Sequence, residues 1–462
     1  METRRIGSAG DSRSRFTAVA VYSRMEQTGF FRCGSEEVNR LFHNSLWSMR
    51  TNFVDIPTDC PTRERAGWTG DAGLFAPTAV YLMDCYPVLR KWLGECRLAQ
   101  WENGLVQHIA PKNDRGSKFS NMLQGSAGWG DACILVPWAL YQAYGRREIL
   151  EENYDMMCRW LDFLEKRARK TRPQNLKNPW HKYLADQGFH FGEWCQPDVN
   201  NVEAMTKGMM FGAPEVATAY YFRSASLLSQ IAELLGKKED AWRFGRIAEK
   251  VKKAYRYSCT KNGVIDSDRQ CEYVRPLAFG LLEPEEEQAA ADRLNQLVVK
   301  NGYHLNTGFL STPDLCPVLA AHGHADTAYR LLLQTDCPSW LYAVKKGATT
   351  IWETWDGVRD DGTVHDSLNH YSYGAVCGWL FGGVCGIRLK AGELSISPTP
   401  DPSLGFAKAE WRSPVGRIES AWEYRGDRLL LDFTVPVPAS LTLPDGTVRS
   451  LIPGSHHFEL KR

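Results

Sequence analysis

The stretch Gly34-Ser-Glu-Glu-Val-Asn-Arg-Leu-Phe-His-Asn-Ser-Leu46 marks the point where the chain becomes helical. Ser35 is typical of a helix N-cap, and two glutamates follow in the first turn, where carboxylates interact favourably with the helix dipole. Apolar side chains then recur at the spacing of one helix face, at Val38, Leu41, Phe42 and Leu46. Upstream, residues 16–32 alternate and are β-branched or aromatic, which predicts a strand before the first helix.

The helical pattern continues from this stretch to about residue 388. The predicted helices span residues 36–50, 71–83, 86–101, 128–144, 147–169, 213–236, 238–258, 270–281, 285–300, 312–322, 324–334 and 366–382. Helices in consecutive pairs fit an (α/α)6 barrel, in which six hairpins form an inner and an outer ring; an irregular bundle is the alternative. The connections at 103–127, 171–211 and 338–365 are long, and long loops in a compact domain are usually functional or disordered.

The pattern changes after Arg388 to short, mostly alternating runs of strand type, and Asp445-Gly446 resembles a hairpin turn. We therefore predict a mainly α protein with three parts. Residues 1–33 form a short N-terminal β segment or linker, 34–388 the (α/α)6 barrel, and 389–462 a small C-terminal β-sandwich.

Composition restricts the partners. The 462 residues carry a net charge of +1 without long charged blocks, which argues against nucleic acid and anionic membranes. No segment approaches the roughly 18 apolar residues that span a bilayer, and the N-terminus shows no signal peptide. The 13 scattered cysteines indicate reduced thiols, so we expect a soluble, cytoplasmic protein. The oligomeric state stays open, with a homodimer as one alternative.

Four segments place glycine, tryptophan and carboxylate together at a helix boundary. They are Asp59-Cys-Pro-Thr-Arg-Glu-Arg-Ala-Gly-Trp-Thr-Gly-Asp71, Gly128-Trp-Gly-Asp131, Phe191-Gly-Glu-Trp194 and Trp352-Glu-Thr-Trp-Asp-Gly357. A single segment of this kind is more often a helix cap with a packed indole than part of a binding site. Together, in a helical barrel, their loops can meet at one end of the axis as a funnel of acids and indoles, which suits an oxocarbenium-like transition state.

This funnel supplies the candidate site residues. The candidates are Asp59, Arg63, Glu64, Trp68, Asp71, Trp129, Asp131, Glu193, Trp194, Trp352, Glu353, Trp355 and His370. Asp59 and Asp71 would raise the pKa of Glu64, as a general acid needs, whereas Arg63 and Arg65 would lower it unless they pair elsewhere. Among other motifs, His322-Gly-His324 lacks a further ligand and is interpreted as a loop rather than a metal site.

Long motifs in this chain resemble the bacterial α-L-rhamnosidases of glycoside hydrolase family 78. They are Asp55–Ala72, Gly125–Ala132, Gly347–Gly357 and Ser367–Gly374, in the family's order. The resemblance implies an (α/α)6 domain, a C-terminal β-domain, no metal or cofactor, and inversion at the anomeric carbon of a rhamnose-containing glycoside. Carried over by position, Glu64 looks like the general acid and Glu353 like the general base. Asp59, Trp68, Asp71, Trp129, Trp194 and His370 look like rhamnose contacts.

The chain departs from the family in three ways. One acidic residue that usually precedes the position of Glu64 is missing, the usual Gly-Asp-Trp is here Gly192-Glu193-Trp194, and the large β-domains before the barrel are almost wholly absent. Two alternatives therefore stay open: a six-hairpin glycosidase for another sugar, and a catalytically weak carbohydrate-binding relative.

Overall fold

The helices of the chain alternate between an inner and an outer ring, as the periodicity predicts. The computed structural model describes residues 19, 21–112 and 123–461. The inner ring consists of α2 (Thr69–Leu82), α5 (Ala132–Tyr144), α8 (Pro214–Leu234), α10 (Gln270–Phe279), α12 (Thr312–Ala321) and a sixth segment made of η3 (Ser372–Val376), α15 (Cys377–Trp379) and η4 (Leu380–Val384). The outer ring consists of α1 (Glu36–Asn52), α3 (Tyr86–Ala99), α6 (Glu148–Ala168), α9 (Lys238–Cys259), α11 (Pro284–Lys300) and α13 (Ala325–Leu333).

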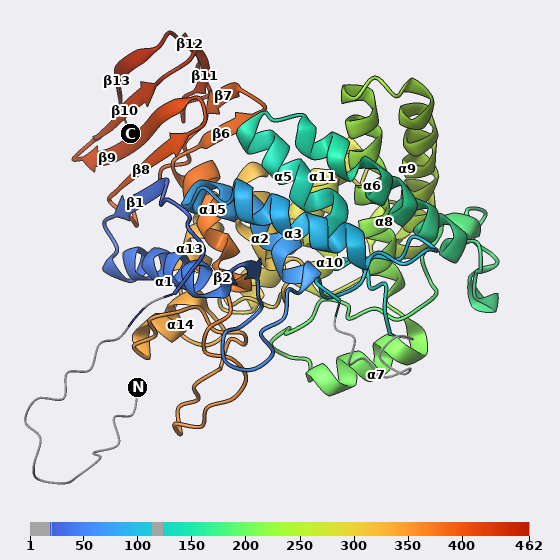
Figure 1. Ribbon diagram of the computed structural model, residues 1–462. Helices are drawn as coiled ribbons and strands as arrows, with labels where there is room; N and C mark the ends of the chain where they lie inside the picture. The colour runs from blue at the N-terminus through green and yellow to red at the C-terminus, as the bar shows by residue number, and fades with distance from the viewer. Residues whose placement is uncertain (1–18, 20, 113–122, 462) are drawn as a thin grey trace, which may run out of the picture.

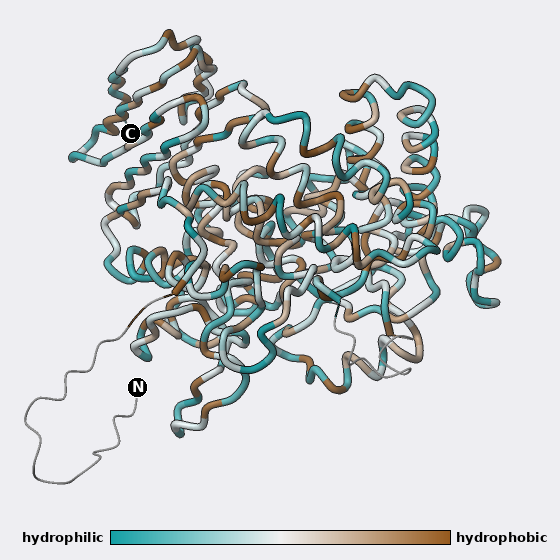
Figure 2. Tube along the Cα trace, in the orientation of Figure 1, coloured by the Kyte–Doolittle hydropathy of each residue, from teal (hydrophilic) through white to brown (hydrophobic). Residues whose placement is uncertain are grey.

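The inner ring is closed. Each inner helix packs on the next, from α2 through α5, α8, α10 and α12, and the sixth segment packs on both α12 and α2. Inner helices are apolar around most of their circumference (α5 has no charged residue), whereas outer helices such as α6 are amphipathic. Figure 2 shows the hydrophobic residues concentrated in the central helices. The predicted (α/α)6 fold is therefore confirmed.

Two helices and several boundaries differ from the sequence prediction; for example, the helix expected from residue 128 begins at Ala132. The long connections contain α7 (Asn201–Phe211) and α14 (Trp340–Lys345), both of which periodicity missed. The sixth inner segment begins at Ser372 rather than at 366, because the backbone is extended before it: His370 N–H donates to the Ile351 carbonyl at 2.8 Å. Short elements complete the chain, namely η1 (Pro173–Asn175), η2 (His181–Tyr183), β2 (Phe53–Val54), β3 (Ile56–Pro57), β4 (Thr260–Lys261) and β5 (Val264–Ile265).

The C-terminal part is a sandwich of two sheets at one corner of the molecule (Figure 1). One sheet has the order β1-β8-β9-β10-β13 and the other β12-β11-β7-β6. The strands are β1 (Gly29–Cys33), β6 (Ile387–Lys390), β7 (Glu393–Ile396), β8 (Phe406–Ser413), β9 (Gly416–Arg425), β10 (Arg428–Val435), β11 (Ala439–Thr442), β12 (Val448–Leu451) and β13 (Gly454–Lys461). The N-terminal strand β1 is thus an edge of the C-terminal sheet, paired antiparallel with β8.

The sandwich is joined to the barrel by buried side chains. Trp411 Nε1 donates to the Val80 carbonyl on α2 at 3.2 Å, and Trp422 Nε1 donates to the Val384 carbonyl at 2.8 Å. The predicted strand over 16–32 is shorter in the structure and begins at Gly29; residues 16–18 and 20 lie outside the described part of the chain.

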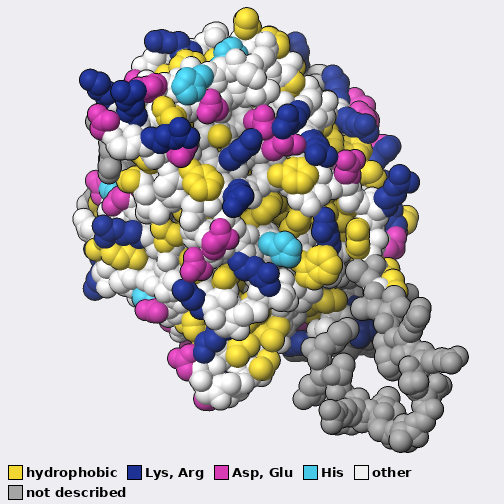
Figure 3. Space-filling view, turned by 90° about the vertical axis from the view of Figure 1, so that its left-hand side faces the viewer, with side chains coloured by type: hydrophobic (Ala, Val, Ile, Leu, Met, Phe, Trp, Pro, Cys, Tyr) yellow, Lys and Arg dark blue, Asp and Glu magenta, His cyan; other side chains and the backbone are white. Residues whose placement is uncertain are grey.

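Surface charge and helix length both bear on whether the protein contacts a membrane. On the face drawn in Figure 3, basic and acidic side chains are interspersed rather than gathered into a field of one sign. Within the described ranges, none of the helices combines the length and the apolar character needed to cross a membrane. All thirteen cysteines are free thiols.

Candidate active site

A cavity opens where the N-terminal ends of the inner helices converge. Its empty volume, mouth included, is about 350 Å³. The cavity is lined by Asp59, Glu64, Trp68, Asp71, Trp129, Phe191, Trp194, Phe309, Glu353 and His370. These residues stand in the segments that lead into α2, α5, α8, α12 and the sixth segment, or in their first turns. The barrel therefore brings together residues that lie more than 300 positions apart in the sequence, from Asp59 to His370.

The loop before α2 supplies one wall. Asp59 and Ala66 close it with two hydrogen bonds: Asp59 N–H donates to the Ala66 carbonyl, and Ala66 N–H donates to the side-chain oxygen Asp59 Oδ1, both at 3.0 Å. Arg65 has φ +54°, a conformation that costs energy for a non-glycine residue and is often found at functional sites. The tight loop turns Glu64 toward Trp68, whose Nε1 donates to Glu64 Oε2 at 2.6 Å.

Glu64 lies at the mouth of the cavity, still exposed on one side. Partial desolvation of its carboxyl raises its pKa, and the Asp59 carboxylate raises it further. The Trp68 hydrogen bond and the Arg63 charge oppose this shift, but Arg63 is directed elsewhere. Burial and the Asp59 charge therefore outweigh the Trp68 hydrogen bond and the Arg63 charge, and the pKa of Glu64 is raised overall.

Glu353 lies deeper, at the base of a hairpin formed by residues 353–367 (Figure 1, orange, below α14). Its backbone N–H donates to the Ser367 carbonyl, and Ser367 N–H donates back to Glu353 Oε2, both at 2.9 Å. Arg63 Nη1 also donates to Oε2, at 3.1 Å. Burial raises the pKa of Glu353 to about 7, against the Ser367 hydrogen bond and the Arg63 charge. Both donors reach Oε2, and Glu353 lines the cavity.

His370 and Asp71 form a buried polar pair on the cavity floor. His370 Nε2 lies 3.1 Å from Asp71 Oδ1, which also accepts a hydrogen bond from Ser372 Oγ at 2.8 Å. Burial lowers the pKa of His370 to about 3, so the imidazole is neutral, and burial raises the pKa of Asp71. His370 Nδ1 is buried and has no hydrogen-bond partner. Its unmet capacity suits a hydroxyl, which can either donate or accept.

Aromatic rings make the remaining walls. Phe191 lies at the centre of the group, with ring centroids 4.5 Å from Trp129, 5.4 Å from Trp194 and 5.9 Å from Trp68. Phe309 packs at 5.1 Å from His370. A pocket of indole and phenyl faces around four carboxyl groups can hold the apolar C–H face of a sugar ring. Phe191 and Phe309 were absent from the sequence-based candidates: Phe191 stood in a quoted segment, and Phe309 lies in a loop without any recognised motif.

Two predicted carboxylates lie outside the cavity. Asp131 is fully buried and accepts hydrogen bonds from Gly128 N–H, Trp160 Nε1 and Ser224 Oγ. Glu193 forms an ion pair with Arg275, which is itself buried and also pairs with Glu215. Each carboxylate is hydrogen-bonded or ion-paired within the protein and holds its loop in place.

Glu193 links two walls of the cavity. Its Oε1 accepts hydrogen bonds from Gly308 N–H at 3.0 Å and Ser311 N–H at 2.9 Å. Next to it, Phe309 N–H donates to the Trp194 carbonyl at 3.0 Å. The longer side chain at position 193 therefore ties the loop of Trp194 to the turn of Phe309.

Three further candidates also lie away from the cavity. Trp355 stacks on Tyr373 at 3.9 Å and its Nε1 donates to the Thr307 carbonyl. Trp352 packs in a small separate cluster with Tyr342 and Ala348. Arg63 is half-exposed beside the cavity and pairs with Glu353 and Asp366. Across the described residues, no group of three His, Cys, Asp or Glu side chains is arranged to hold a metal ion.

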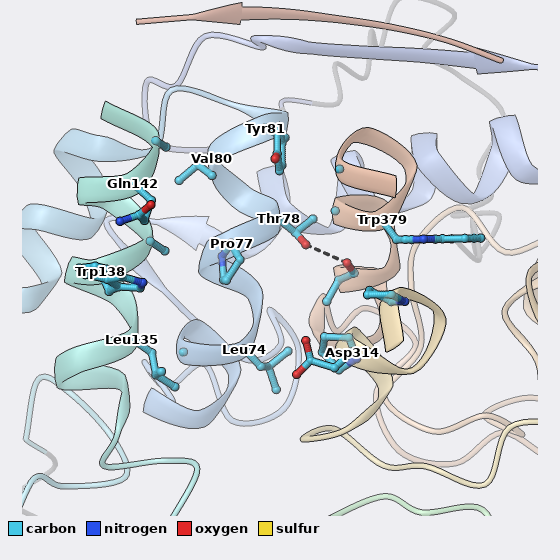
Figure 4. Close-up of a pocket in the computed structure, with 18 of the residues that line it drawn as sticks. Leu74, Pro77, Thr78, Val80, Tyr81, Leu135, Trp138, Gln142, Asp314 and Trp379 are labelled. Atoms are coloured by element: carbon cyan, nitrogen blue, oxygen red, sulfur yellow. Dashed lines mark hydrogen bonds between the residues drawn. The ribbon is translucent and has the colours of Figure 1, made fainter. Parts of the chain in front are cut away.

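A larger cavity lies within the inner ring, beside the sandwich (Figure 4). Its empty volume, mouth included, is about 1530 Å³, and its walls are mainly apolar, with Leu74, Pro77 and Trp138 among them. Asp314 is the only carboxylate that lines it among the described residues. A single carboxyl group cannot provide both an acid and a base, so the smaller cavity is the stronger catalytic candidate despite its size.

The closed ring of hairpins and the paired carboxyls in a cavity of aromatic rings define the class as a six-hairpin glycosidase. Residues 26–384 match the bacterial alpha-L-rhamnosidase 6 hairpin glycosidase domain, and residues 392–457 match the bacterial alpha-L-rhamnosidase C-terminal domain. The chain belongs to the bacterial α-L-rhamnosidase family, glycoside hydrolase family 78.

Similar proteins agree with this assignment. An alpha-L-rhamnosidase of Formosa agariphila is 35% identical over 97% of this chain, and one of Streptomyces avermitilis is 38% identical over 91%. The crystal structure of the S. avermitilis enzyme complexed with L-rhamnose matches 95% of this chain and 43% of its own with a TM-score of 0.84 and 35% identity. The native Aspergillus terreus enzyme matches 95% of this chain and 51% of its own, with a TM-score of 0.86 and 31% identity. The chain spans 47% and 38% of the lengths of the two sequence relatives.

Arg275→Met should destabilise the protein, because it leaves Glu193 and Glu215 without the buried cation that both carboxylates contact. We expect a loss of about 3–5 kcal/mol, seen as a lower urea midpoint. Arg246→Met is the matched control: this arginine is exposed, its ion pair with Glu249 is long, at 3.8 Å, and its guanidinium lies over the Trp242 ring. The double variant Glu193→Gln/Arg275→Met should recover part of the loss. An unchanged midpoint for Arg275→Met would show that the ion pairs contribute nothing.

Proposed function

We propose that this chain hydrolyses α-L-rhamnosides with inversion of configuration. The observation that carries the proposal is the placement of Glu64 and Glu353 in one cavity, from different loops, among aromatic walls and beside an unpaired buried His370 Nδ1. The relatives named above are alpha-L-rhamnosidases, and one was crystallised with L-rhamnose, which supports the choice of sugar.

Glu64 is assigned as the general acid. Its position at the mouth places it where a leaving aglycone exits, and its raised pKa favours the protonated form that can donate to the glycosidic oxygen. Trp68 Nε1 holds one oxygen of the carboxyl and leaves the other for the substrate.

Glu353 is assigned as the general base. Ser367 N–H and Arg63 fix its Oε2, so that Oε1 can take a proton from water as water attacks the anomeric carbon. For inversion the two carboxyl groups should stand about 6.5–9.5 Å apart, which leaves space for this water, whereas a retaining enzyme needs about 5–5.5 Å.

The rest of the cavity is assigned to the sugar ring. Trp68, Trp129 and Trp194 suit the apolar face and the C5 methyl of rhamnose. Asp59, Asp71 and His370 suit its hydroxyls, since all three are buried and polar. A hydroxyl with the wrong configuration would leave these groups unpaired, which costs far more than a misplaced methyl.

We also propose a cytoplasmic location. Its support is the set of thirteen free thiols, of which ten are buried and one, Cys337, is exposed. Such thiols persist in a reducing compartment. A homodimer remains an untested prediction.

The sugar assignment is tested with nitrophenyl α-L-glycosides. We expect the rhamnoside to be hydrolysed fastest. The L-mannoside should be hydrolysed roughly 10–200-fold more slowly, which is the discrimination that one methyl group can supply. The L-fucoside should be hydrolysed much more slowly still. Proton NMR of the first product should show the β-anomer. Faster cleavage of the fucoside would favour a six-hairpin glycosidase for another sugar, and release of the α-anomer would refute inversion. A complete lack of hydrolysis would favour a carbohydrate-binding relative.

The two carboxyl roles predict different responses to the leaving group. Glu353→Gln should abolish turnover of every substrate, because all need an activated water. Glu64→Gln should slow alkyl rhamnosides by roughly 10²–10⁴-fold and nitrophenyl rhamnoside much less, because nitrophenolate leaves without protonation. Steady-state rates of both variants on both substrates provide the comparison. Equal losses of Glu64→Gln on the two substrates would show that Glu64 is not the acid.

The pH profile of Glu64→Gln isolates the base. With the acid removed, kcat/KM for nitrophenyl rhamnoside should follow the ionisation of Glu353 alone and rise with pH. The midpoint should lie at or below about 7, because loss of the nearby Glu64 anion removes one influence that raises the pKa of Glu353. A rate that falls as pH rises would mean that Glu353 acts in its protonated form, which would reverse the two roles.

A further inference from the structure

The general base is connected to a row of charges along its hairpin. Arg63 Nη1 lies 3.1 Å from Glu353 Oε2 and 3.3 Å from Asp366 Oδ1, so one guanidinium serves two carboxylates. Asp366 Oδ2 in turn lies 2.8 Å from His365 Nδ1. The row runs from the cavity to the neck of the hairpin, and neither His365 nor Asp366 lines the cavity.

His365 is placed so that its charged form is favoured. Its second nitrogen, Nε2, lies 2.8 Å from the Asp356 carbonyl and 3.1 Å from Asp356 Oδ1. Both ring nitrogens therefore face acceptors, and only an imidazolium can donate to both. Consistent with this geometry, Asp366 and Asp356 raise the pKa of His365 against partial burial.

The backbone holds Asp366 in place for this contact. Asp366 has φ +54°, and the next residue, Ser367, exchanges hydrogen bonds with Glu353. In this conformation the Asp366 carboxylate lies toward Arg63, with Oδ1 at 3.3 Å from Arg63 Nη1. A strained residue beside a reacting group is a recurrent feature of functional sites.

We propose that Asp366 and His365 are positioning residues of the reaction: Asp366 shares Arg63 with Glu353, and His365 controls how strongly Asp366 competes for it. The inference rests on the proposed role of Glu353 as base. With His365 charged, Asp366 is largely neutralised, and Arg63 stabilises the Glu353 carboxylate. Without that charge, Asp366 draws Arg63 away and repels the Glu353 anion.

Other charged groups near Glu353 are kept constant by the test. Groups that interact electrostatically with Glu353 include Arg63, Glu64, Asp71, Cys195, Asp366 and Tyr373. Of these, Asp366 alone contacts His365. A change at His365 therefore reaches Glu353 mainly through Asp366 and Arg63.

The experiment measures the pH midpoint of kcat/KM on nitrophenyl α-L-rhamnoside in the Glu64→Gln background. Asp366→Asn removes the competing anion, so the midpoint should fall by about half a pH unit. His365→Asn keeps a donor near the Nδ1 position but removes the charge, so the midpoint should rise by a similar amount. The double variant should resemble Asp366→Asn, because His365 then has no anion to neutralise. Asparagine is also among the residues that best tolerate positive φ, so Asp366→Asn should fold.

Asp361→Asn is the matched control. Asp361 lies at the exposed tip of the same hairpin, its side chain accepts a hydrogen bond from Thr363 N–H, and it makes no contact with Arg63. This variant should leave the midpoint unchanged. Shifts of the two test variants in the same direction, no shift in either, or a change confined to KM would overturn the inference. Absence of rhamnoside hydrolysis by the unmodified chain would instead refute the proposed function.

Discussion

The closure of the inner ring between α2 and the sixth segment is the constraint on which the rest of the structure depends. The two elements meet through the Thr78 hydroxyl, which donates to the Ala375 carbonyl at 2.8 Å, and a Cβ at Gly378 would lie only 2.6 Å from that oxygen. On its other side, α2 meets α5 so closely that a Cβ at Gly73 would lie 3.2 Å from the Ala132 Cβ. Since helix positions are fixed this tightly, the loops that precede them are fixed as well.

The seam between α2 and the sixth segment also lies beside the residues to which we assign the acid and base roles. Glu64 precedes α2, and Glu353 and His370 precede the sixth segment, so ring closure sets one carboxyl group opposite the other. Asp71, on the first turn of α2, bonds to both Ser372 and His370 across the same seam. The cavity therefore inherits its geometry from helix packing rather than from its loops alone.

Periodicity predicted the helices well because outer helices are amphipathic and inner ones are long apolar runs. It failed at the sixth inner segment, where 3₁₀ and π turns replace regular helix and Asp366 takes a positive φ. The site was harder to predict for a physical reason. Asp131 and Glu193 stand beside glycine and tryptophan as Asp71 does, but their partners, Ser224 and Arg275, lie about 80 to 90 positions away. Sequence shows that a carboxylate is present, not whether a protein cation or a sugar will satisfy it. Phe309 had no signal at all, since a single phenylalanine in a loop resembles any other.

The position of β1 has a consequence for how this chain can be divided. Residues 29–33 pair with five of the eight residues of β8, with Gly29 opposite Trp411 and Cys33 opposite Ala407. A fragment cut before β6 to isolate the sandwich would lose this strand and present a row of unsatisfied backbone N–H and C=O groups on β8. Such an edge is a template for pairing with another molecule. The strand β1 thus covers one edge of the C-terminal sheet although it precedes the barrel in the sequence.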